Sequence, residues 1–323
     1  MVKKRALEET LKELHHLRAD PGSEASQAAL RRIVSRESSL AVAKAAAIVG
    51  DFTLGALVAD LEAAFDRFFA EPVRSDPGCA AKRAIVEALR RLDHGDLELY
   101  RRGSRHIQME PVWGGQVDTA VDLRGSSALA LAEHGGEGVL TDLADLLADP
   151  EPPVRAAAAH AVSVLGRGAG IPLLHLKALA GDPEPRVITE CLLALLRLDA
   201  AGSLPFVASF LDKPVGPAEA AAAALGESRL RDAFPVLRSW LDRSAMRGLR
   251  RAALRAIASL RRDEAIEFLL SLVADEPVPA AREALDALAS LGRDEALEDR
   301  VRTVTGSRPE LAEAFTRAFG QRA

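Results

Sequence analysis

The sequence has few aromatic residues. Of its 323 residues one is Tyr, two are Trp and ten are Phe, which is 4% in all. That number is too small for a typical β-sheet protein or for a cofactor pocket lined with aromatic rings. Ala, Leu, Arg and Glu are abundant instead, and all four are strong helix formers. The composition therefore indicates an all-α protein that is long enough to bury a large core.

Features of secreted and membrane proteins are also missing. The two cysteines, Cys79 and Cys191, form no CxxC pair, which excludes a disulfide framework and a cysteine-based zinc site. No apolar run has the length of a membrane span, and the charged start lacks the apolar segment of a signal peptide. The formal net charge of −5 argues against indiscriminate nucleic-acid binding. We expect a cytoplasmic protein.

An internal repeat is present along most of the sequence. Apolar helices that end in a turn residue recur about every 30 to 40 residues, which is the length of two helices and two short turns. The predicted ends are Gly50, Asp93, Gly135, Gly166, Asp199, Gly226, Arg261, Gly292 and Gly320. Four Asp-Pro pairs predict helix starts, with Asp as the N-cap and Pro as the first helical residue. These pairs are Asp20-Pro21, Asp76-Pro77, Asp149-Pro150 and Asp182-Pro183.

The repeat predicts an α-solenoid of about nine antiparallel helix pairs with an extra N-terminal helix, in which each pair buries its apolar faces against the next. We expect a single solenoid over residues 1–323. Its predicted parts are an N-terminal capping helix (1–20), repeats (21–304) with a loop insertion at 103–117, and a C-terminal cap (305–323).

Residues 149–166, DPEPPVRAAAAHAVSVLG, resemble the HEAT repeat of the bacterial, phycobilisome-lyase type. The family's mark is an Asp six residues before a basic residue that starts the second helix. Three pairs keep this spacing and form the predicted structural ladder: Asp76 and Lys82, Asp118 and Arg124, and Asp149 and Arg155. Two positions depart from this pattern. Six residues after Asp182 stands Ile188 in place of a basic residue, and six residues before Arg250 stands Ser244 in place of Asp. The resemblance implies that the second helices line a concave surface.

Catalytic motifs are missing. There is no HExxH motif and no GxSxG motif, and the seven histidines are scattered without a carboxylate at ligand spacing. The sequence gives no positive case for an enzyme, and we expect no catalytic residue, metal or cofactor.

Arginine is concentrated in one segment. Residues 229–262 contain ten Arg and two Asp, whereas residues 263–300 contain eleven acidic residues and three Arg. Helical spacing places four arginines on one face, and two more candidates lie on earlier second helices. The six candidates are Arg247, Arg251, Arg255, Arg262, Arg83 and His160. They predict a positively charged groove for phosphate, an acidic peptide or an acidic protein; the alternative is a solvated arginine face balanced by the acidic repeat beside it.

The long loop at 103–117 interrupts the repeat. Residues 106–110 alternate polar and apolar and predict an extended piece, and Pro111 with Gly114-Gly115 predicts a turn around Trp113. Its apolar residues are costly to leave in water, so we do not expect the loop to be disordered; it either binds a partner or plugs a wide gap between repeats. We expect the loop to place its candidate binding residues beside the small residues Gly125 and Ala156. The candidates are Arg105, His106, Gln108, Glu110 and Trp113.

Three functions are compatible with these patterns. The first is a protein–protein interaction scaffold that binds a partner of acidic character in its concave groove, with Trp113, Arg251 and Arg255 as hot spots. The alternative is nucleic-acid binding, by analogy with HEAT-like DNA glycosylases that cradle a duplex. A chromophore lyase is a remote alternative that depends on fold-level analogy alone. We expect no membrane partner, and a monomer or weak oligomer.

Overall fold

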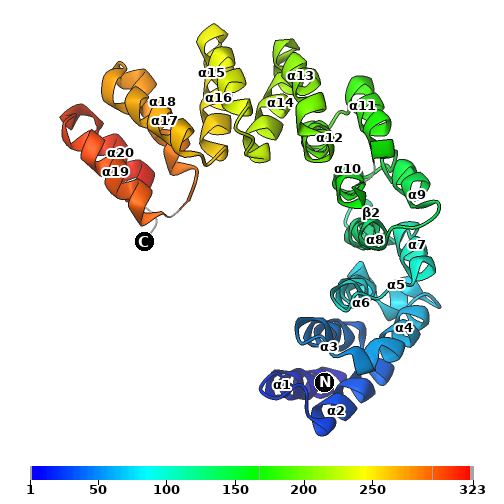
Figure 1. Ribbon diagram of the computed structural model, residues 1–323. Helices are drawn as coiled ribbons and strands as arrows, with labels where there is room; N and C mark the ends of the chain where they lie inside the picture. Colours follow the sequence, from blue (N-terminus) through cyan, green and yellow to red (C-terminus); the bar gives the residue numbers. More distant parts are fainter. Residues whose placement is uncertain (1, 167, 293, 321–323) are drawn as a thin grey trace. The chain divides into compact units, whose positions relative to one another are not determined.

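The computed structural model describes residues 2–166, 168–292 and 294–320 (Figure 1). The chain divides into two compact units, Met1–Gly166 and Arg167–Ala323, and each is described by itself. Within the described residues there are twenty α-helices, a few short 3-10 turns and one two-stranded sheet. None of these helices is both long and apolar enough to cross a membrane.

The first unit begins with α1 (Val2–Leu17) and continues as four helix pairs. The first helices of the pairs are α2 (Glu24–Arg36), α4 (Val58–Arg67), α7 (Leu97–Ser104) and α9 (Val139–Leu146). The second helices are α3 (Ser39–Asp51), α6 (Ala80–Arg91), α8 (Val121–His134) and α10 (Pro152–Leu165). A short helix, α5 (Pro72–Ser75), lies between α4 and α6.

The second unit consists of five helix pairs. The first helices are α11 (Ile171–Ala180), α13 (Ala200–Ser209), α15 (Ala233–Arg243), α17 (Asp263–Asp275) and α19 (Glu295–Gly306). The second helices are α12 (Pro185–Leu198), α14 (Val215–Ser228), α16 (Arg247–Ser259), α18 (Val278–Ala289) and α20 (Ala312–Phe319).

Second helices of neighbouring pairs pack against one another in each unit. In the first unit α3 packs on α6, α6 on α8 and α8 on α10; in the second, α12, α14, α16, α18 and α20 pack in that order (Figure 1). This nearest-neighbour packing confirms the predicted α-solenoid, and the described residues contain the expected nine pairs and the extra N-terminal helix. The predicted division into caps and repeats of one continuous solenoid stays a prediction.

Two glycines that were predicted to end helices lie inside them. Helix α3 continues to Asp51 and α14 continues to Ser228, so Gly50 and Gly226 are helical. A Cβ on Gly50 would lie 2.9 Å from Ala88 Cα, and one on Gly226 would lie 2.5 Å from the carbonyl oxygen of Ala256. Both glycines therefore permit close approach of the next second helix, a role that local sequence does not distinguish from a helix end. Gly166, by contrast, ends α10 with φ 68° as expected.

The Asp-Pro prediction of helix starts holds for Asp76, which is the N-cap of a 3-10 turn that begins at Pro77, and is wrong in detail for the other three pairs. Helix α10 begins at Pro152 and α12 at Pro185, two residues after the predicted prolines. The Asp149 carboxylate accepts the Glu151 N–H at 2.8 Å, and Asp182 accepts the Glu184 N–H at 2.9 Å. Each Asp thus closes a turn before the helix rather than capping the helix itself.

The loop insertion forms a β-hairpin between α7 and α8. Strands β1 (Met109–Val112) and β2 (Gly115–Asp118) pair antiparallel, with Val112 opposite Gly115. Trp113 and Gly114 form the two-residue turn, and Gly114 has φ 89°, a conformation that glycine adopts without strain. The predicted turn around Trp113 is therefore confirmed, and the extended piece lies slightly later than expected.

Candidate functional site

The β-hairpin exposes apolar side chains. Trp113 at its turn is fully exposed, with 103% of its reference surface in contact with solvent. Ile107, Met109, Val112 and Val117 are each between 44% and 58% exposed. The hairpin therefore does not plug a gap between repeats, and of the two alternatives for its apolar residues only binding to a partner stays as a prediction.

Polar side chains attach the base of the hairpin to the repeats. Gln108 is buried, at 1% exposure, and its Nε2 donates to the Asp76 carbonyl oxygen at 2.8 Å and to Glu110 Oε1 at 2.6 Å. The same Glu110 oxygen accepts the Thr119 hydroxyl at 2.8 Å and the Gly78 backbone N–H at 2.7 Å. Because these hydrogen bonds fix the base, the apolar residues nearer the tip are not needed to anchor the hairpin.

His106 belongs to the same base. Its Nε2 lies 3.1 Å from Gln108 Oε1, and its ring centroid lies 4.7 Å from that of Phe69. Because the Gln108 amide nitrogen already donates elsewhere, the Gln108 oxygen faces His106, so His106 Nε2 carries a hydrogen. Burial lowers the pKa of His106, and the charges of Lys82 and Arg124 act in the same direction, against the hydrogen bond with Gln108.

Two carboxylates at the hairpin base have lowered pKa values. Burial opposes the ionisation of Glu110, but hydrogen bonds from neighbouring donors, beginning with Gln108, hold the pKa of Glu110 below its ordinary value. Burial likewise opposes the ionisation of Asp118, whose pKa is lowered by the backbone N–H groups of Gln108 and Ala120 and by the Arg124 guanidinium. Both groups are therefore anionic at neutral pH.

A buried ion pair lies beneath the hairpin. Lys82 Nζ lies 3.1 Å from Asp76 Oδ2, and both side chains are fully buried. The Asp76 carboxylate also accepts the backbone N–H groups of Ala81 at 2.8 Å and Lys82 at 3.0 Å. The carboxylate therefore fixes the start of α6 directly under the contact that Gln108 makes with the Asp76 carbonyl oxygen.

A second ionic cluster joins consecutive helix pairs. Arg124 on α8 lies 2.6 Å from Asp118 Oδ2 and 2.9 Å from Asp149 Oδ2. Arg155 donates to the carbonyl oxygen of Asp149 at 2.8 Å. In this arrangement the six-residue spacing places an Asp before each of the second helices α6, α8 and α10, at the edge where the hairpin is attached.

The arginines that lead into the hairpin pair with first helices. Arg105 Nη2 lies 2.8 Å from Asp142 on α9, and Arg101 Nε lies 2.9 Å from the same carboxylate. Arg102 Nη1 lies 2.6 Å from Asp66 on α4. All three arginines therefore pair with carboxylates of first helices.

Tyr100, the single tyrosine, is not part of the exposed site. It is fully buried in α7, and its hydroxyl donates to the His94 carbonyl oxygen at 2.8 Å. Burial raises the pKa of Tyr100. Trp113 is therefore exposed without a neighbouring tyrosine.

In the second unit, two of the candidate arginines share one carboxylate. Arg247 and Arg251 on α16 lie 2.6 and 3.3 Å from Glu283 Oε1 on α18, and the Glu283 side chain is only 9% exposed. Arg255 lines a small cleft beside Asp286. This pairing matches the alternative of an arginine face balanced by the neighbouring acidic repeat.

The other candidate residues lie apart from that face. Arg262 follows α16 as the N-cap of α17, and its guanidinium donates to the Arg229 carbonyl oxygen at 3.2 Å. In the first unit, Arg83 lies 3.1 Å from Asp122, and His160 is half-buried on α10. Because the candidates belong to two separately described units, a single groove that contains them all stays a prediction.

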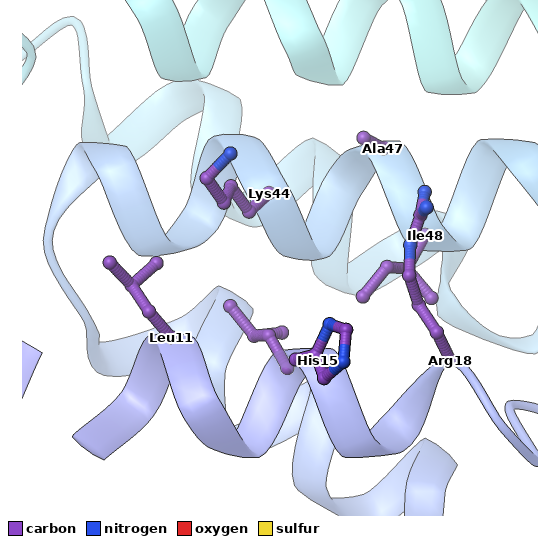
Figure 2. A pocket seen from close by; sticks show the side chains of 7 residues that line it. Leu11, His15, Arg18, Lys44, Ala47 and Ile48 are labelled. Carbon is purple, nitrogen blue, oxygen red and sulfur yellow. The ribbon is translucent and has the colours of Figure 1, made fainter. Parts of the chain in front are cut away.

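Sequence reasoning missed two features of the first unit. Glu62, His94 and Asp96 place one ligand atom each within 4.8 Å of one another. His94 Nε2 lies 2.8 Å from Glu62, and Asp96 caps α7 through the N–H groups of Glu98 and Leu99, so these contacts account for the cluster. The second feature is a cleft between α1 and α3, which no sequence motif marks because it depends on how the terminal helix packs (Figure 2).

Residues 218–289, which extend from α14 to the end of α18, match the family model of HEAT repeats. The chain contains HEAT repeats. The predicted resemblance to HEAT repeats is thus confirmed for these residues, and the bacterial, phycobilisome-lyase type stays a prediction. No curated protein matches the HEAT-repeat chain.

Solved structures also resemble the chain. The complex of CpcE and CpcF of phycocyanin lyase from Nostoc sp. PCC7120 is 19% identical, covers 76% of this chain and 94% of its own, and has a TM-score of 0.39. Human deoxyhypusine hydroxylase in complex with glycerol is 18% identical over 84% of this chain and 98% of its own, with a TM-score of 0.34. An engineered protein is 15% identical over 95% of this chain and 90% of its own, with a TM-score of 0.36. At such low similarity, no activity is transferred from them.

Proposed function

We propose that this HEAT-repeat protein is a scaffold that binds a partner protein, with the β-hairpin as its anchor. The observation that carries the proposal is the fully exposed Trp113 at the turn of a hairpin whose base is buried and hydrogen-bonded. Exposed apolar groups of this kind mark interaction sites in soluble proteins, and Trp is enriched among residues that dominate binding energy. Because the base is fixed, little conformational entropy is lost when the tip is bound.

The arginine candidates favour a protein partner over a nucleic acid. Phosphate binding depends on positive charge that is available to the ligand. Two of the arginines on α16 already pair with Glu283, and Arg83 pairs with Asp122. A partner that contacts any of these arginines must therefore replace an existing ion pair, whereas Trp113 is open to contact. Nothing observed in the described residues favours the chromophore-lyase alternative.

Substitution of Trp113 tests the proposal. Immobilised wild-type protein and Trp113→Ala and Trp113→Phe variants are used to capture proteins from a lysate of the source cell, with quantification by mass spectrometry. We expect at least one partner to be retained by the wild type and Trp113→Phe and its affinity to fall about thirtyfold with Trp113→Ala, because loss of a hot-spot aromatic costs about 2 kcal/mol. Identified partners are then titrated as purified proteins.

Phe52→Ala provides the matched control, because Phe52 is another exposed aromatic residue of the first unit. It should leave capture unchanged, and thermal melting of all variants should coincide. If Trp113→Ala retains every specific partner of the wild type, the hairpin is not the anchor and the proposal is wrong.

A further inference from the structure

The cleft between α1 and α3, called the α1/α3 cleft here, has a volume of about 370 Å³. Figure 2 shows its two ends: Lys44 of α3 lies above Leu11 at one end, Arg18, the residue after α1, lies beside Ile48 at the other, and His15 is between them. Seven residues line it: Leu11, Leu14, His15, Arg18, Lys44, Ala47 and Ile48. The volume is at the lower end for ligand sites, which suits one or two inserted side chains rather than a large cofactor.

The lining of the α1/α3 cleft combines an apolar floor with a basic rim. Four lining residues are apolar, three are basic and none is acidic. Among the described residues, no carboxylate forms an ion pair with Lys44 or His15. Arg18 lies 2.5 Å from Asp51, which also pairs with Arg91. The Asp51 carboxylate therefore orients Arg18, but its single negative charge is shared between two guanidinium groups.

We propose that the α1/α3 cleft binds an acidic peptide segment of a partner protein, and this rests on the proposed scaffold function. An apolar side chain of the peptide enters between Leu11 and Ile48, and flanking carboxylates contact Lys44 and Arg18. Charge complementarity selects this occupant, since the rim is basic and nothing acidic lines the cleft. A second copy that docked cleft to cleft would be a poor occupant, because it would bring two basic rims together. A nucleic-acid backbone would leave the apolar floor unfilled.

Fluorescence polarisation with a labelled synthetic peptide, EDLLDE, tests the cleft in the full-length protein. Two matched peptides serve as controls: QNLLNQ keeps the leucines without charge, and EDSSDE keeps the charge without leucines. We expect EDLLDE to bind at low ionic strength, each control peptide to bind about tenfold more weakly, and raised salt to weaken EDLLDE binding.

Variants locate the binding site. Lys44→Glu should weaken EDLLDE binding about tenfold, whereas Lys12→Glu, an equal charge change on α1 outside the lining, should change it by less than about threefold. Ala47→Trp fills the cleft without changing its charge and should also weaken binding, with thermal melting to verify folding. The proposal is overturned if EDLLDE does not bind, if QNLLNQ or EDSSDE binds equally well, or if Lys44→Glu and Lys12→Glu have equal effects.

The outcome is separable from that of the hairpin experiment. Trp113→Ala should leave EDLLDE binding unchanged because Trp113 does not line the cleft. Failure of the peptide to bind while capture still depends on Trp113 removes the cleft proposal alone. Peptide binding without any Trp113-dependent partner removes the hairpin as anchor and leaves the cleft as the binding site.

Discussion

Lys82 and Asp76 show what residue spacing can and cannot predict. The six-residue spacing identified them as a pair, and the structure places them 3.1 Å apart with both side chains fully buried. The complete burial of the two side chains was not predictable, because the hairpin that helps to cover them lies about thirty positions later in the sequence. Desolvation of two ions offsets much of their attraction, so the pair is better understood as fixing the start of α6 than as a large net source of stability.

His106 makes stability depend on pH. Burial lowers its folded pKa below the ordinary value of 6.5, so the unfolded chain binds the proton more tightly than the folded chain does. The contribution is therefore fully present above pH 6.5 and is lost as the pH falls from there toward the folded pKa. We expect the free energy of unfolding, measured in urea, to decrease across this window, and His106→Phe to remove part of the decrease.

Wild type and His106→Phe are compared by how steeply the free energy of unfolding changes with pH, and not by its absolute value. His106→Phe also leaves Gln108 Oε1 without its hydrogen bond, which lowers stability at every pH. A ring-proton titration by NMR measures the folded pKa of His106 directly. An unchanged slope in the variant, or a folded pKa above 6.5, would contradict the prediction.

At the scale of elements, the turn of the β-hairpin was predictable from the sequence, but the environment of its apolar residues was not. Pro111 and Gly114-Gly115 indicate a turn at Trp113, because few residues adopt the required backbone conformation. The sequence left open whether its apolar residues bind a partner or plug a gap, because the polar contacts of Gln108 and Glu110 that anchor the base leave no mark in the local sequence. Those contacts join segments far apart in the sequence, which periodicity does not reveal.

Glu110 is expected to seat the hairpin. Its Oε1 accepts three hydrogen bonds, from Gln108, Thr119 and Gly78, so Glu110→Ala leaves three donors without that acceptor. We expect Glu110→Ala to lower the free energy of unfolding by about 1–3 kcal/mol and to increase amide exchange in β1 and β2. Denaturant unfolding and hydrogen exchange with mass spectrometry measure the two effects.

Glu98→Ala is the matched control for Glu110→Ala. Glu98 is largely exposed and pairs with Arg101 on the surface of α7, where an ion pair contributes about 0–1 kcal/mol. Equal effects of the two substitutions on stability and on hairpin exchange would show that Glu110 does not hold the hairpin.

At the scale of the whole molecule, the fold was predictable because it repeats. Nine helix pairs give nine chances to recognise the same pattern, so errors at single boundaries, such as Gly50 and Gly226, do not change the architecture. The division at Gly166 was not predicted. No shift in composition marks it, since both sides carry the same kind of repeat.

Nearest-neighbour packing predicts that damage to one unit stays local. Lys82→Met leaves the Asp76 carboxylate buried without its cation, at a cost of about 3–5 kcal/mol. Because each helix pair contacts mainly its neighbours, we expect faster amide exchange in α3, α6 and α8 while α12 to α20 keep their protection. Leu254→Ala creates a cavity in α16 of the second unit, costs about 2–5 kcal/mol, and should give the opposite pattern. Hydrogen exchange with mass spectrometry distinguishes the two patterns; a loss of protection throughout both units in either variant would mean that the chain unfolds as one cooperative body.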